Sequence, residues 1–433
     1  MFKKFIVLFG FLVLFNSEAE RYRGASFQKL ENGLSVIFVD TPRADSLLVV
    51  LCVSSGSTDE TDKRGVANLL CHMFSRKLKE KADADPPQYR LESNSYVGYD
   101  QSEYYFYGKT ENLDGFINNL GATFSGFTFS SSDLNESKKI IEQQISEDQQ
   151  IDRNRVRHEA RKSLYWHSGY GSSCDVDSLR SISEEDVKNF KNRNYVNGRA
   201  TLIIAGKVDK KRALEMVNKC FSKEKIESTI NRLQEPPHHG STTRITRSSS
   251  QVSVPIIEMY WRIPNYRNEK GKALAAEIFI NHLGEVLQKN LVETQKIAAS
   301  ISFSYSFWNH DCGDFCMTIT SKNSDKVEEV VTAVLSEIKY IASEKITEEQ
   351  AKKAARKLYN ANNVFNIEVD VIDFVNWISK KIGACYDFDF LKSYDQFIDK
   401  FDLNEVHSQA KAIFRNDPCV ISILTPAEKK NAN

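Results

Sequence analysis

The chain has 433 residues, of which 41% are hydrophobic and 27% charged, enough for two to four globular domains. Its 58 basic and 58 acidic residues cancel, so composition gives no support to nucleic-acid binding through a global basic field. After the first 20 residues, no apolar run reaches membrane-spanning length.

The amino-terminal segment has the pattern of a secretory signal. Met1–Lys4 is basic, the run from Phe5 to Phe15 is apolar, and Ser17 and Ala19 are small residues at the expected cleavage positions. We expect cleavage after Ala19, and hence a periplasmic or secreted protein. The alternative is a retained membrane anchor, for which the apolar run is short.

The first half of the chain predicts strands near 34–40 and 46–54, followed by a helix near 66–79. Asn68 and His72 are four residues apart on that helix and share one face, whereas Cys71 points about 100° away from His72. A single His on such a helix is more typical of a packed or hydrogen-bonded side chain than of a metal ligand. The neighbouring thiol does not readily chelate the same ion.

The remaining elements repeat this order. In the first half, strands are expected at 93–99 and 103–109, followed by helices to about residue 150. The second half begins with a β-rich run at 251–262 and a helix at 271–291. It continues with strands at 299–308 and 314–321 and helices at 326–343 and 347–365. The recurring order predicts an internal duplication. We therefore expect an α+β fold of two homologous α/β sandwich halves, each a mostly antiparallel sheet covered by helices.

The domain boundaries follow from composition. Residues 223–250 contain Pro236-Pro237, Gly240 and many Ser and Thr residues, which break regular structure and cannot bury a core. We expect a signal peptide at 1–19, an N-terminal domain at 20–222, a linker at 223–250 and a C-terminal domain at 251–433.

The eight cysteines are dispersed and form no C-x-x-C motif. Cys312 and Cys316 lie in or beside a predicted strand, where four residues span roughly 13 Å, so they should not pair with each other. Most of the cysteines are expected to be buried small apolar residues.

Several segments, in order, resemble the pitrilysin and mitochondrial processing peptidase family of inverted zinc peptidases. The matching segments are Asn32–Val36, Val49–Val53, Gly56–Glu60, Asn94–Tyr104, Tyr170-Gly171, Leu179–Val187, Tyr195–Asn197 and Leu202–Asp209. The resemblance covers most of the chain after the leader, and the order and spacing of the segments carry it.

The resemblance implies where a catalytic site would lie. Family members carry H-x-x-E-H, in which two His residues bind zinc and the Glu is the general base. This chain reads N-x-x-C-H: Asn68 stands at the first ligand position, Cys71 at the general-base position and His72 at the second ligand position. The third ligand position falls on Gln144, or on an acid one turn later, Glu147 or Asp148. The motif is therefore degenerate.

The resemblance also implies substrate-binding positions. Asn94 matches a family residue that meets the substrate backbone, and a strand-end Asn in a turn is the alternative interpretation. An Arg and a Tyr seven residues apart grip the substrate in many members. Val292 and Ala299 occupy those two positions here.

These replacements predict a pseudoenzyme: a non-catalytic homologue that forms a heterodimer with an active relative, or a homodimer, and binds extended peptides. No cofactor is expected in that case, and no nucleic acid or membrane partner after signal cleavage. The alternative is a zinc-dependent endopeptidase with a remodelled site built from His72, Cys71 and an acid between 142 and 148. A purely structural subunit or a peptide scavenger is a third possibility.

Overall fold

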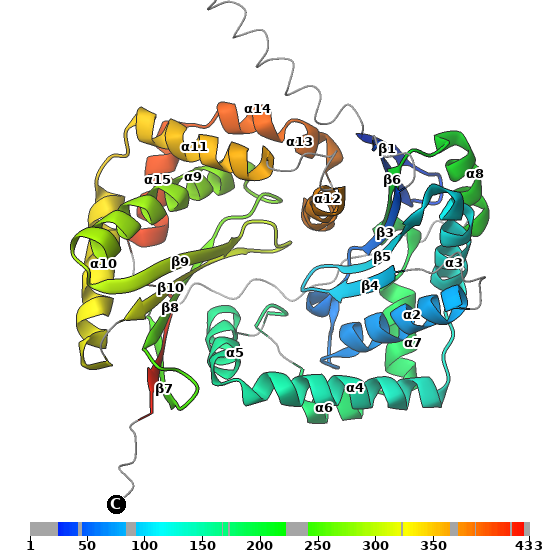
Figure 1. Ribbon diagram of the computed structural model, residues 1–433, viewed down its shortest axis with the longest axis horizontal. Coiled ribbons are helices and arrows are strands. Elements are labelled where there is room, and N and C mark those ends of the chain that lie inside the picture. Colours follow the sequence, from blue (N-terminus) through cyan, green and yellow to red (C-terminus); the bar gives the residue numbers. More distant parts are fainter. Residues whose placement is uncertain are drawn as a thin grey trace, which may run out of the picture. The chain divides into compact units, whose positions relative to one another are not determined.

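The computed structural model describes residues 25–41, 46–83, 92–166, 168–171, 174–221, 241–321, 324–363, 371–385, 387–415 and 418–427. The predicted signal peptide at 1–19 and most of the predicted linker lie outside these residues. Two compact units are present, and each is discontinuous in sequence (Figure 1). Unit 1 contains Met1–Lys139, Asp177–Asn231 and Asn363–Asp395; unit 2 contains Ile140–Val176, Arg232–Asn362 and Gln396–Asn433.

Unit 1 is built on a six-stranded sheet in the order β1-β2-β6-β3-β5-β4. Neighbouring strands are antiparallel except for the parallel pair β2 and β6. The strands are β1 (Ala25–Lys29), β2 (Ser35–Val39), β3 (Ser46–Val53), β4 (Glu92–Val97), β5 (Ser102–Lys109) and β6 (Ala200–Gly206). β4 therefore lies at one edge of the sheet.

Both faces of the central strand β3 are covered, which explains its continuous apolar run. The helix α2 (Val66–Asp83) packs on the face that carries Tyr104, and α12 (Val371–Cys385) packs on the opposite face. On that second face the Cys52 thiol lies 3.8 Å from the Ser379 carbonyl oxygen. A segment from late in the chain thus completes the core of the first sheet.

Unit 2 is built on a five-stranded sheet in the order β7-β11-β8-β10-β9. The strands are β7 (Thr243–Ser249), β8 (Ile256–Ile263), β9 (Ala298–Ser306), β10 (Gly313–Ser321) and β11 (Val420–Pro426). Only β7 and β11 are parallel. This order matches β2-β6-β3-β5-β4 strand for strand, which confirms the predicted mostly antiparallel sheets and shows the same topology twice.

The second sheet has helices on both faces, of which one face is apolar and the other carries polar side chains. Trp261 contacts Phe414 of α15 on the apolar face, while α5 lies on the face that carries Glu258. Arg153 and Arg157 of α5 both form ion pairs with the buried Glu258 carboxylate. Because α5 precedes the predicted linker, unit 2 also takes part of its core from the first half of the chain.

The helices have the following bounds. They are α3 (Leu113–Ser125), α4 (Ser131–Gln150), α5 (Asp152–Tyr165), α6 (Val176–Ser181), α7 (Glu184–Asn194), α8 (Lys210–Cys220), α9 (Lys270–Leu287), α10 (Val327–Ser343), α11 (Glu348–Asn363), α13 (Phe388–Lys392), α14 (Tyr394–Asp399) and α15 (Leu403–Phe414), and a π-helical turn spans Gln288–Thr294. Among the described residues, none of these helices is long and apolar enough to cross a bilayer.

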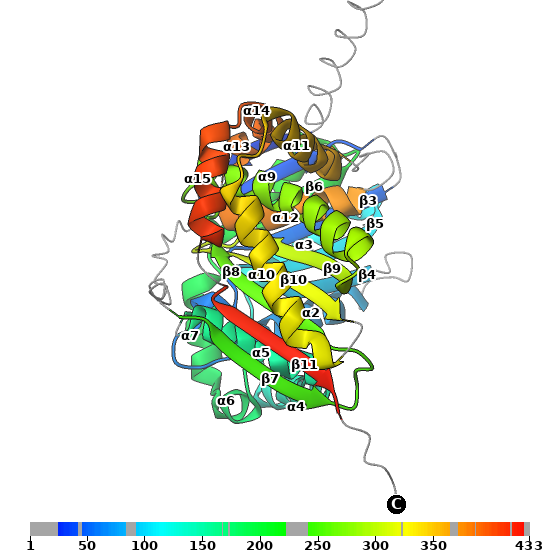
Figure 2. The same ribbon diagram turned by 90° about the vertical axis from the view of Figure 1, so that its left-hand side faces the viewer.

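The predicted linker differs from the structure at its end. Residues Thr243–Ser249 form β7, which pairs in parallel with β11, as Figure 2 shows. Its polar composition suits an outer strand, since only Ile245 and Ser249 are buried and the backbone ladder supplies the pairing. Residues 223–240 of the predicted linker lie outside the described part of the chain.

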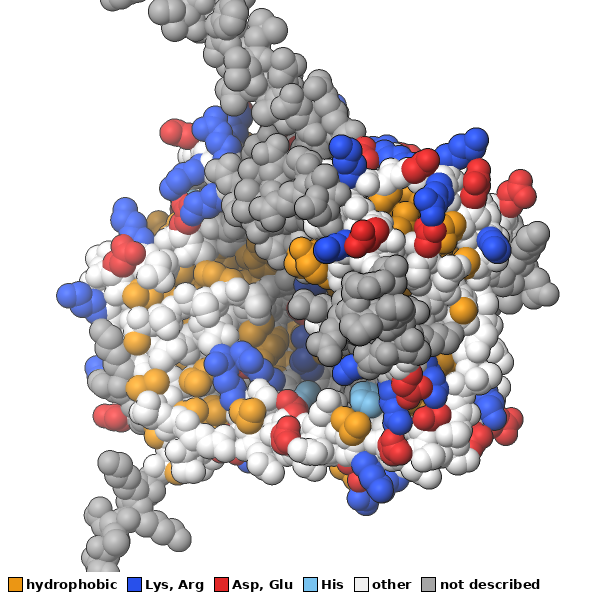
Figure 3. Space-filling view, turned by 45° about the vertical axis from the view of Figure 1, so that its right-hand side comes forward, with side chains coloured by type: hydrophobic (Ala, Val, Ile, Leu, Met, Phe, Trp, Pro, Cys, Tyr) orange, Lys and Arg blue, Asp and Glu red, His pale blue; other side chains and the backbone are white. Residues whose placement is uncertain are grey.

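Cys312 and Cys316 are not joined by a disulfide, in keeping with the distance that a strand imposes between them. Cys52, Cys71, Cys312 and Cys316 are buried, as expected for small apolar residues. On the face drawn in Figure 3, basic and acidic side chains are interspersed, in keeping with the balanced charge.

Candidate functional site

The amino-terminal end of α2 is fixed by a buried acid. Gly65, at φ +97°, lies just before the helix, and the Glu60 carboxylate accepts hydrogen bonds from the backbone N–H groups of Gly65 and Ala67 at 2.9–3.0 Å. These are N–H groups that the first turn of a helix leaves unpaired. Burial raises the pKa of Glu60 to about 7, although both hydrogen bonds favour the charged form.

The segment between β3 and α2 is held by a buried ion pair. Arg199 lies 2.8 Å from Asp59, and both side chains are 4% exposed. A Cβ on Gly56 would lie 2.3 Å from the Gly98 carbonyl oxygen, so only glycine fits there. The motif Gly56–Glu60 therefore positions α2, and its role is structural.

Cys71 points from α2 into the core. The side chain is 3% exposed and lies against Tyr104 of β5 and Ser95 of β4. Burial raises the pKa of the thiol to about 11, while hydrogen bonds with Tyr104 and Ser95 partly oppose the shift. The group is a neutral thiol at physiological pH, and so it cannot accept a proton as the family carboxylate does.

His72 points away from Cys71 and contacts α4. Its Nδ1 lies 3.0 Å from the hydroxyl oxygen of Ser137, which is fully buried. Partial burial, and then the nearby Arg76 guanidinium, lower the pKa of His72. The imidazole is therefore neutral at pH 7 and is already held by a hydroxyl group.

Of the other predicted ligand positions, Asn68 and Gln144 offer only an amide, while the acids Glu147 and Asp148 lie 2.8 Å from Gln143 and 2.7 Å from His158, respectively. Asn68 is half-buried one turn before His72, and Gln144 is exposed on α4, two turns after Ser137. In the parts of the chain that the structure describes, no three His, Cys, Asp or Glu residues are grouped to hold a metal ion. The imidazole of His72 with the amides of Asn68 and Gln144 does not match the ligands that zinc takes in proteins, so these three residues do not fit a catalytic zinc ion.

The strand beside this helix forms one edge of its sheet. β4 is the last strand in its sheet, and α2 packs next to it. Asn94 is exposed, with its side-chain oxygen accepting a hydrogen bond from Ser95 N–H at 2.8 Å, and Tyr96 is 52% exposed. An edge strand has backbone groups available for pairing with another extended segment.

Comparison with known families matches both halves of the chain. Residues 35–174 match the family described as "Insulinase (Peptidase family M16)", and residues 181–358 match "Peptidase M16 inactive domain". The chain belongs to the M16 peptidase family. The solved structure of pitrilysin aligns over 95% of this chain and 46% of its own, with a TM-score of 0.75 at 16% identity, so the chain shares the fold of about half of that protein.

The curated relatives include M16 proteins of bacteria and mitochondria. An uncharacterized zinc protease of Rickettsia felis is 23% identical over 89% of this chain and 92% of its own length. The mitochondrial-processing peptidase subunit beta of Saccharomyces cerevisiae is 22% identical over 80% of this chain and 79% of its own length.

Solved structures confirm the M16 fold. A protease from Helicobacter pylori has a TM-score of 0.77 at 18% identity and aligns over 93% of this chain and 99% of its own. A chain of complex III2 from Candida albicans has a TM-score of 0.74 at 14% identity, over 93% and 96% of the two chains. At these identities the likeness concerns the fold.

The two remaining M16 positions lie in unit 2. Val292 is half-buried in the π-helical turn after α9, and Ala299 is exposed on β9. Both side chains are hydrocarbon, so neither position supplies a guanidinium or phenol group to a substrate.

Sequence reasoning missed two polar groups of unit 1. Ser137, the partner of His72, lies seven residues before Gln144 on the same face of α4, a spacing that could have identified it. Glu103 is 1% exposed on β5 and accepts hydrogen bonds from Gln101, at 2.7 Å, and from Tyr105. Burial raises the pKa of Glu103. No sequence pattern marked it, because it lies within an aromatic strand.

Proposed function

We propose that this M16 chain is a non-catalytic member of its family, which binds extended peptides and forms a subunit of an assembly with an active relative. The observation that carries the proposal is the state of α2: Cys71 is a buried neutral thiol, and His72 is engaged by Ser137. M16 hydrolysis needs several metal donors and a proton acceptor at these positions. This chain offers one imidazole.

Peptide binding is supported by the edge position of β4 in the first sheet. An extended peptide can add to β4 as a further strand through main-chain hydrogen bonds, which do not depend on metal chemistry. The exposed Asn94 and Tyr96 would contact its side chains. The loss of the metal ligands leaves this edge intact.

The subunit role is supported by the kinds of protein that this chain resembles. Curated relatives are named as mitochondrial-processing peptidase subunit beta, and one structural neighbour comes from complex III2. The partner, in this proposal, is an M16 chain with an intact zinc motif in the periplasm or outside the cell.

Metal analysis and native purification test the proposal together. The purified chain should hold far less than one zinc ion per molecule at micromolar free zinc and should cleave no peptide. Purified from its own cells, it should elute with an M16 relative. A stoichiometric zinc ion with cleavage that chelators abolish would contradict the non-catalytic role, and elution alone would contradict the partnership.

The second candidate is a zinc-dependent endopeptidase with a remodelled site. It is favoured by the retained His72, which is only half-buried, and by relatives that carry the name zinc protease. In this case His72, Cys71 and an acid between 142 and 148 must converge on zinc. Zinc binding that is lost in His72→Ala and in Cys71→Ala would support it.

A reconstruction experiment tests the assignment of ligand positions. Asn68→His, Cys71→Glu and Gln144→Glu together restore the family residues, so we expect the triple variant to gain zinc affinity by at least tenfold. The Asn68→His, Gln144→Glu double variant is a control without an acid at the buried position 71, where a carboxylate could destabilise the core. No gain in either variant would show that the ligand positions are misassigned.

A further inference from the structure

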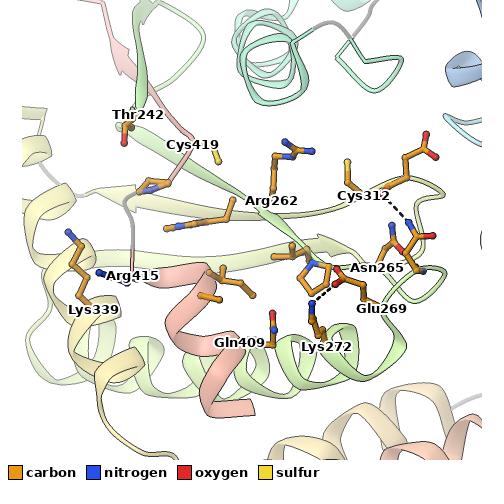
Figure 4. Close-up of a pocket in the computed structure, with 18 of the residues that line it drawn as sticks. Thr242, Arg262, Asn265, Glu269, Lys272, Cys312, Lys339, Gln409, Arg415 and Cys419 are labelled. Atoms are coloured by element: carbon orange, nitrogen blue, oxygen red, sulfur yellow. Dashed lines mark hydrogen bonds and ion pairs between the residues drawn. The ribbon is translucent and has the colours of Figure 1, made fainter. Parts of the chain in front are cut away.

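The polar face of the second sheet carries an arginine stripe that the peptidase site does not explain. Arg153, Arg157 and Arg161 follow each other at intervals of four residues on α5, so their side chains project from one side of the helix. That side meets the sheet face on which Glu258 lies. None of these four residues lines the cavity of about 1150 Å³ at the end of β8, which Gln409 of α15 borders (Figure 4).

Two guanidinium groups share one carboxylate on this face. Arg153 Nη2 and Arg157 Nη2 lie 2.9 Å and 2.8 Å from the same carboxylate oxygen of Glu258, and Arg157 Nε lies 3.0 Å from it. The other oxygen accepts a hydrogen bond from the Tyr260 hydroxyl at 2.7 Å. Burial opposes ionisation of Glu258, but the hydrogen bonds from Arg157 and Tyr260 outweigh it and lower the pKa of this carboxyl. The Glu258 carboxylate is therefore ionised at neutral pH.

One positive charge of this pair of arginines is left without a counter-charge. Among the described residues, Glu258 is the only acid within ion-pair distance of Arg153 and Arg157. Another buried acid on the same face, Asp314, pairs with Arg161 at 3.1 Å. The Arg153 and Arg157 side chains are 36% and 44% exposed. Their contacts with Glu258 use Nε and Nη2, so both Nη1 groups can donate to a second carboxylate that arrives from solvent.

Hydroxyl groups continue this site across the sheet. Thr318 of β10 lies opposite Glu258 of β8, and Ser302 of β9 lies opposite Thr318, so the three side chains form one cross-strand row on the same face. Glu258 is buried, Thr318 is half-buried and Ser302 is exposed. The Thr318 hydroxyl oxygen lies 3.4 Å from the Glu258 carboxylate. A group bound by the two guanidinium groups is therefore bordered by the Ser302 hydroxyl, which can donate a hydrogen bond to it.

We propose that this face binds a carboxylate group of a peptide, either an Asp or Glu side chain or the terminal carboxylate. The inference rests on the peptide-binding role proposed above and adds a substrate class to it, acidic peptides. The Nη1 groups of Arg153 and Arg157 bind the carboxylate, and Ser302 donates a hydrogen bond to it. Charge complementarity selects this occupant, because a basic side chain meets net positive charge and an apolar one leaves these donors without an acceptor.

Three pools of decapeptides test this preference on the full chain. Each pool carries an uncharged fluorophore and is random over uncharged residues outside one fixed position. The first pool has Glu there and an amidated carboxyl end, the second has Gln and the same amide, and the third has Gln and a free terminal carboxylate. Fluorescence anisotropy at low salt should give a dissociation constant about fivefold or more lower for at least one acidic pool than for the neutral pool. The two acidic pools distinguish a side chain from a terminal carboxylate.

Variants of Ser302 locate the preference. Ser302→Asp places a carboxylate of the chain itself beside the two guanidinium groups, so the preference for acidic peptides should fall below about twofold. Ser302→Asn has nearly the same size without the charge and should retain the preference. Ser302 is exposed on the last strand of its sheet, so neither replacement disturbs the core. Thr246→Asp adds the same charge on β7, on the opposite face of the sheet, and should also retain it.

The outcomes separate this inference from the function on which it rests. Equal binding of the three pools by the unaltered protein would overturn the carboxylate site and leave peptide binding in place. A preference that survives in Ser302→Asp, or that is lost equally in Thr246→Asp, would also overturn it. If none of the pools binds, the peptide-binding role is contradicted together with the site.

Discussion

At the scale of single residues, burial decides what the site can do. Cys71 and His72 are neighbours in sequence, but one enters the core beside Tyr104 and the other meets Ser137 on α4. Helical periodicity predicted this divergence, because consecutive residues point about 100° apart. It could not predict that a buried serine would hold the imidazole, since that contact joins residues 65 positions apart.

The burial of Cys71 should protect its thiol from alkylation. With a pKa of about 11, only about one thiol in a thousand is ionised at pH 8, and the side chain is 3% exposed. In the native protein, iodoacetamide should modify Cys71 at least tenfold more slowly than Cys174, which is partly exposed. Mass spectrometry of digested samples measures both rates. Similar rates in the native protein, or a difference that persists in denaturant, would contradict this explanation.

Glu60 should make stability depend on pH. Its pKa is about 7 in the folded chain and near 4.5 when unfolded, so the native state retains a proton that the unfolded state releases. The free energy of unfolding therefore falls as pH rises from about 4.5 to 7, by up to about 1.4 kcal/mol per pH unit from this group. The contribution of Glu60 to the free energy of unfolding is fully present below pH 4.5 and is lost above pH 7.

The variant Glu60→Gln isolates that contribution, because an amide does not titrate. Urea unfolding between pH 4.5 and 7.5 should give a flatter pH dependence for the variant than for the unaltered protein. Other titrating groups affect both proteins equally and cancel in the difference. Parallel curves across this range would show that the pKa of Glu60 is not raised.

At the scale of elements, alternation and helical spacing predicted most of the strands and helices. The expected strands at 34–40, 46–54 and 103–109 are found as β2, β3 and β5 within one or two residues. β7 was missed because a polar outer strand has no apolar alternation to detect. Its pairing depends on β11, more than 170 residues away, and local sequence does not encode that contact.

The cap of α7 gives a test at this scale. The hydroxyl oxygen of Ser183 accepts from Asp186 N–H at 3.2 Å, and the Asp186 carboxylate accepts from Ser183 N–H at 2.7 Å. Ser183→Ala should lower the free energy of unfolding by about 1 kcal/mol, and Ser183→Thr by much less. Urea midpoints at an unchanged slope measure both. Equal losses in the two variants would mean that the hydroxyl cap contributes little.

At the scale of the whole molecule, the two units exchange segments of the chain. The halves predicted at 20–222 and 251–433 each contain one sheet, apart from β7, but α5 belongs to unit 2 and α12 to unit 1. The alternation of apolar and polar residues predicted most strands of both sheets. It gave no indication of the exchange, because an amphipathic helix does not specify which sheet it covers.

The exchange predicts that the two halves do not fold separately. A fragment of residues 20–222 lacks α12 over β3, and a fragment of 251–433 leaves the buried Glu258 without Arg153 and Arg157. An unpaired buried charge costs several kcal/mol. Each fragment alone should lack a cooperative thermal transition by circular dichroism, and co-expression should restore one. A fragment of 20–222 that melts within a few degrees of the full chain would contradict this.

The placement of α12 against β3 has a consequence for biosynthesis. The first sheet is complete by residue 206, yet one of its faces stays open until residues 371–385 have left the ribosome. The nascent protein therefore exposes an apolar surface while residues 207–385 are synthesised, and a chaperone or an export factor has time to engage it before the fold closes. For the export that we propose, such a delay would be an advantage.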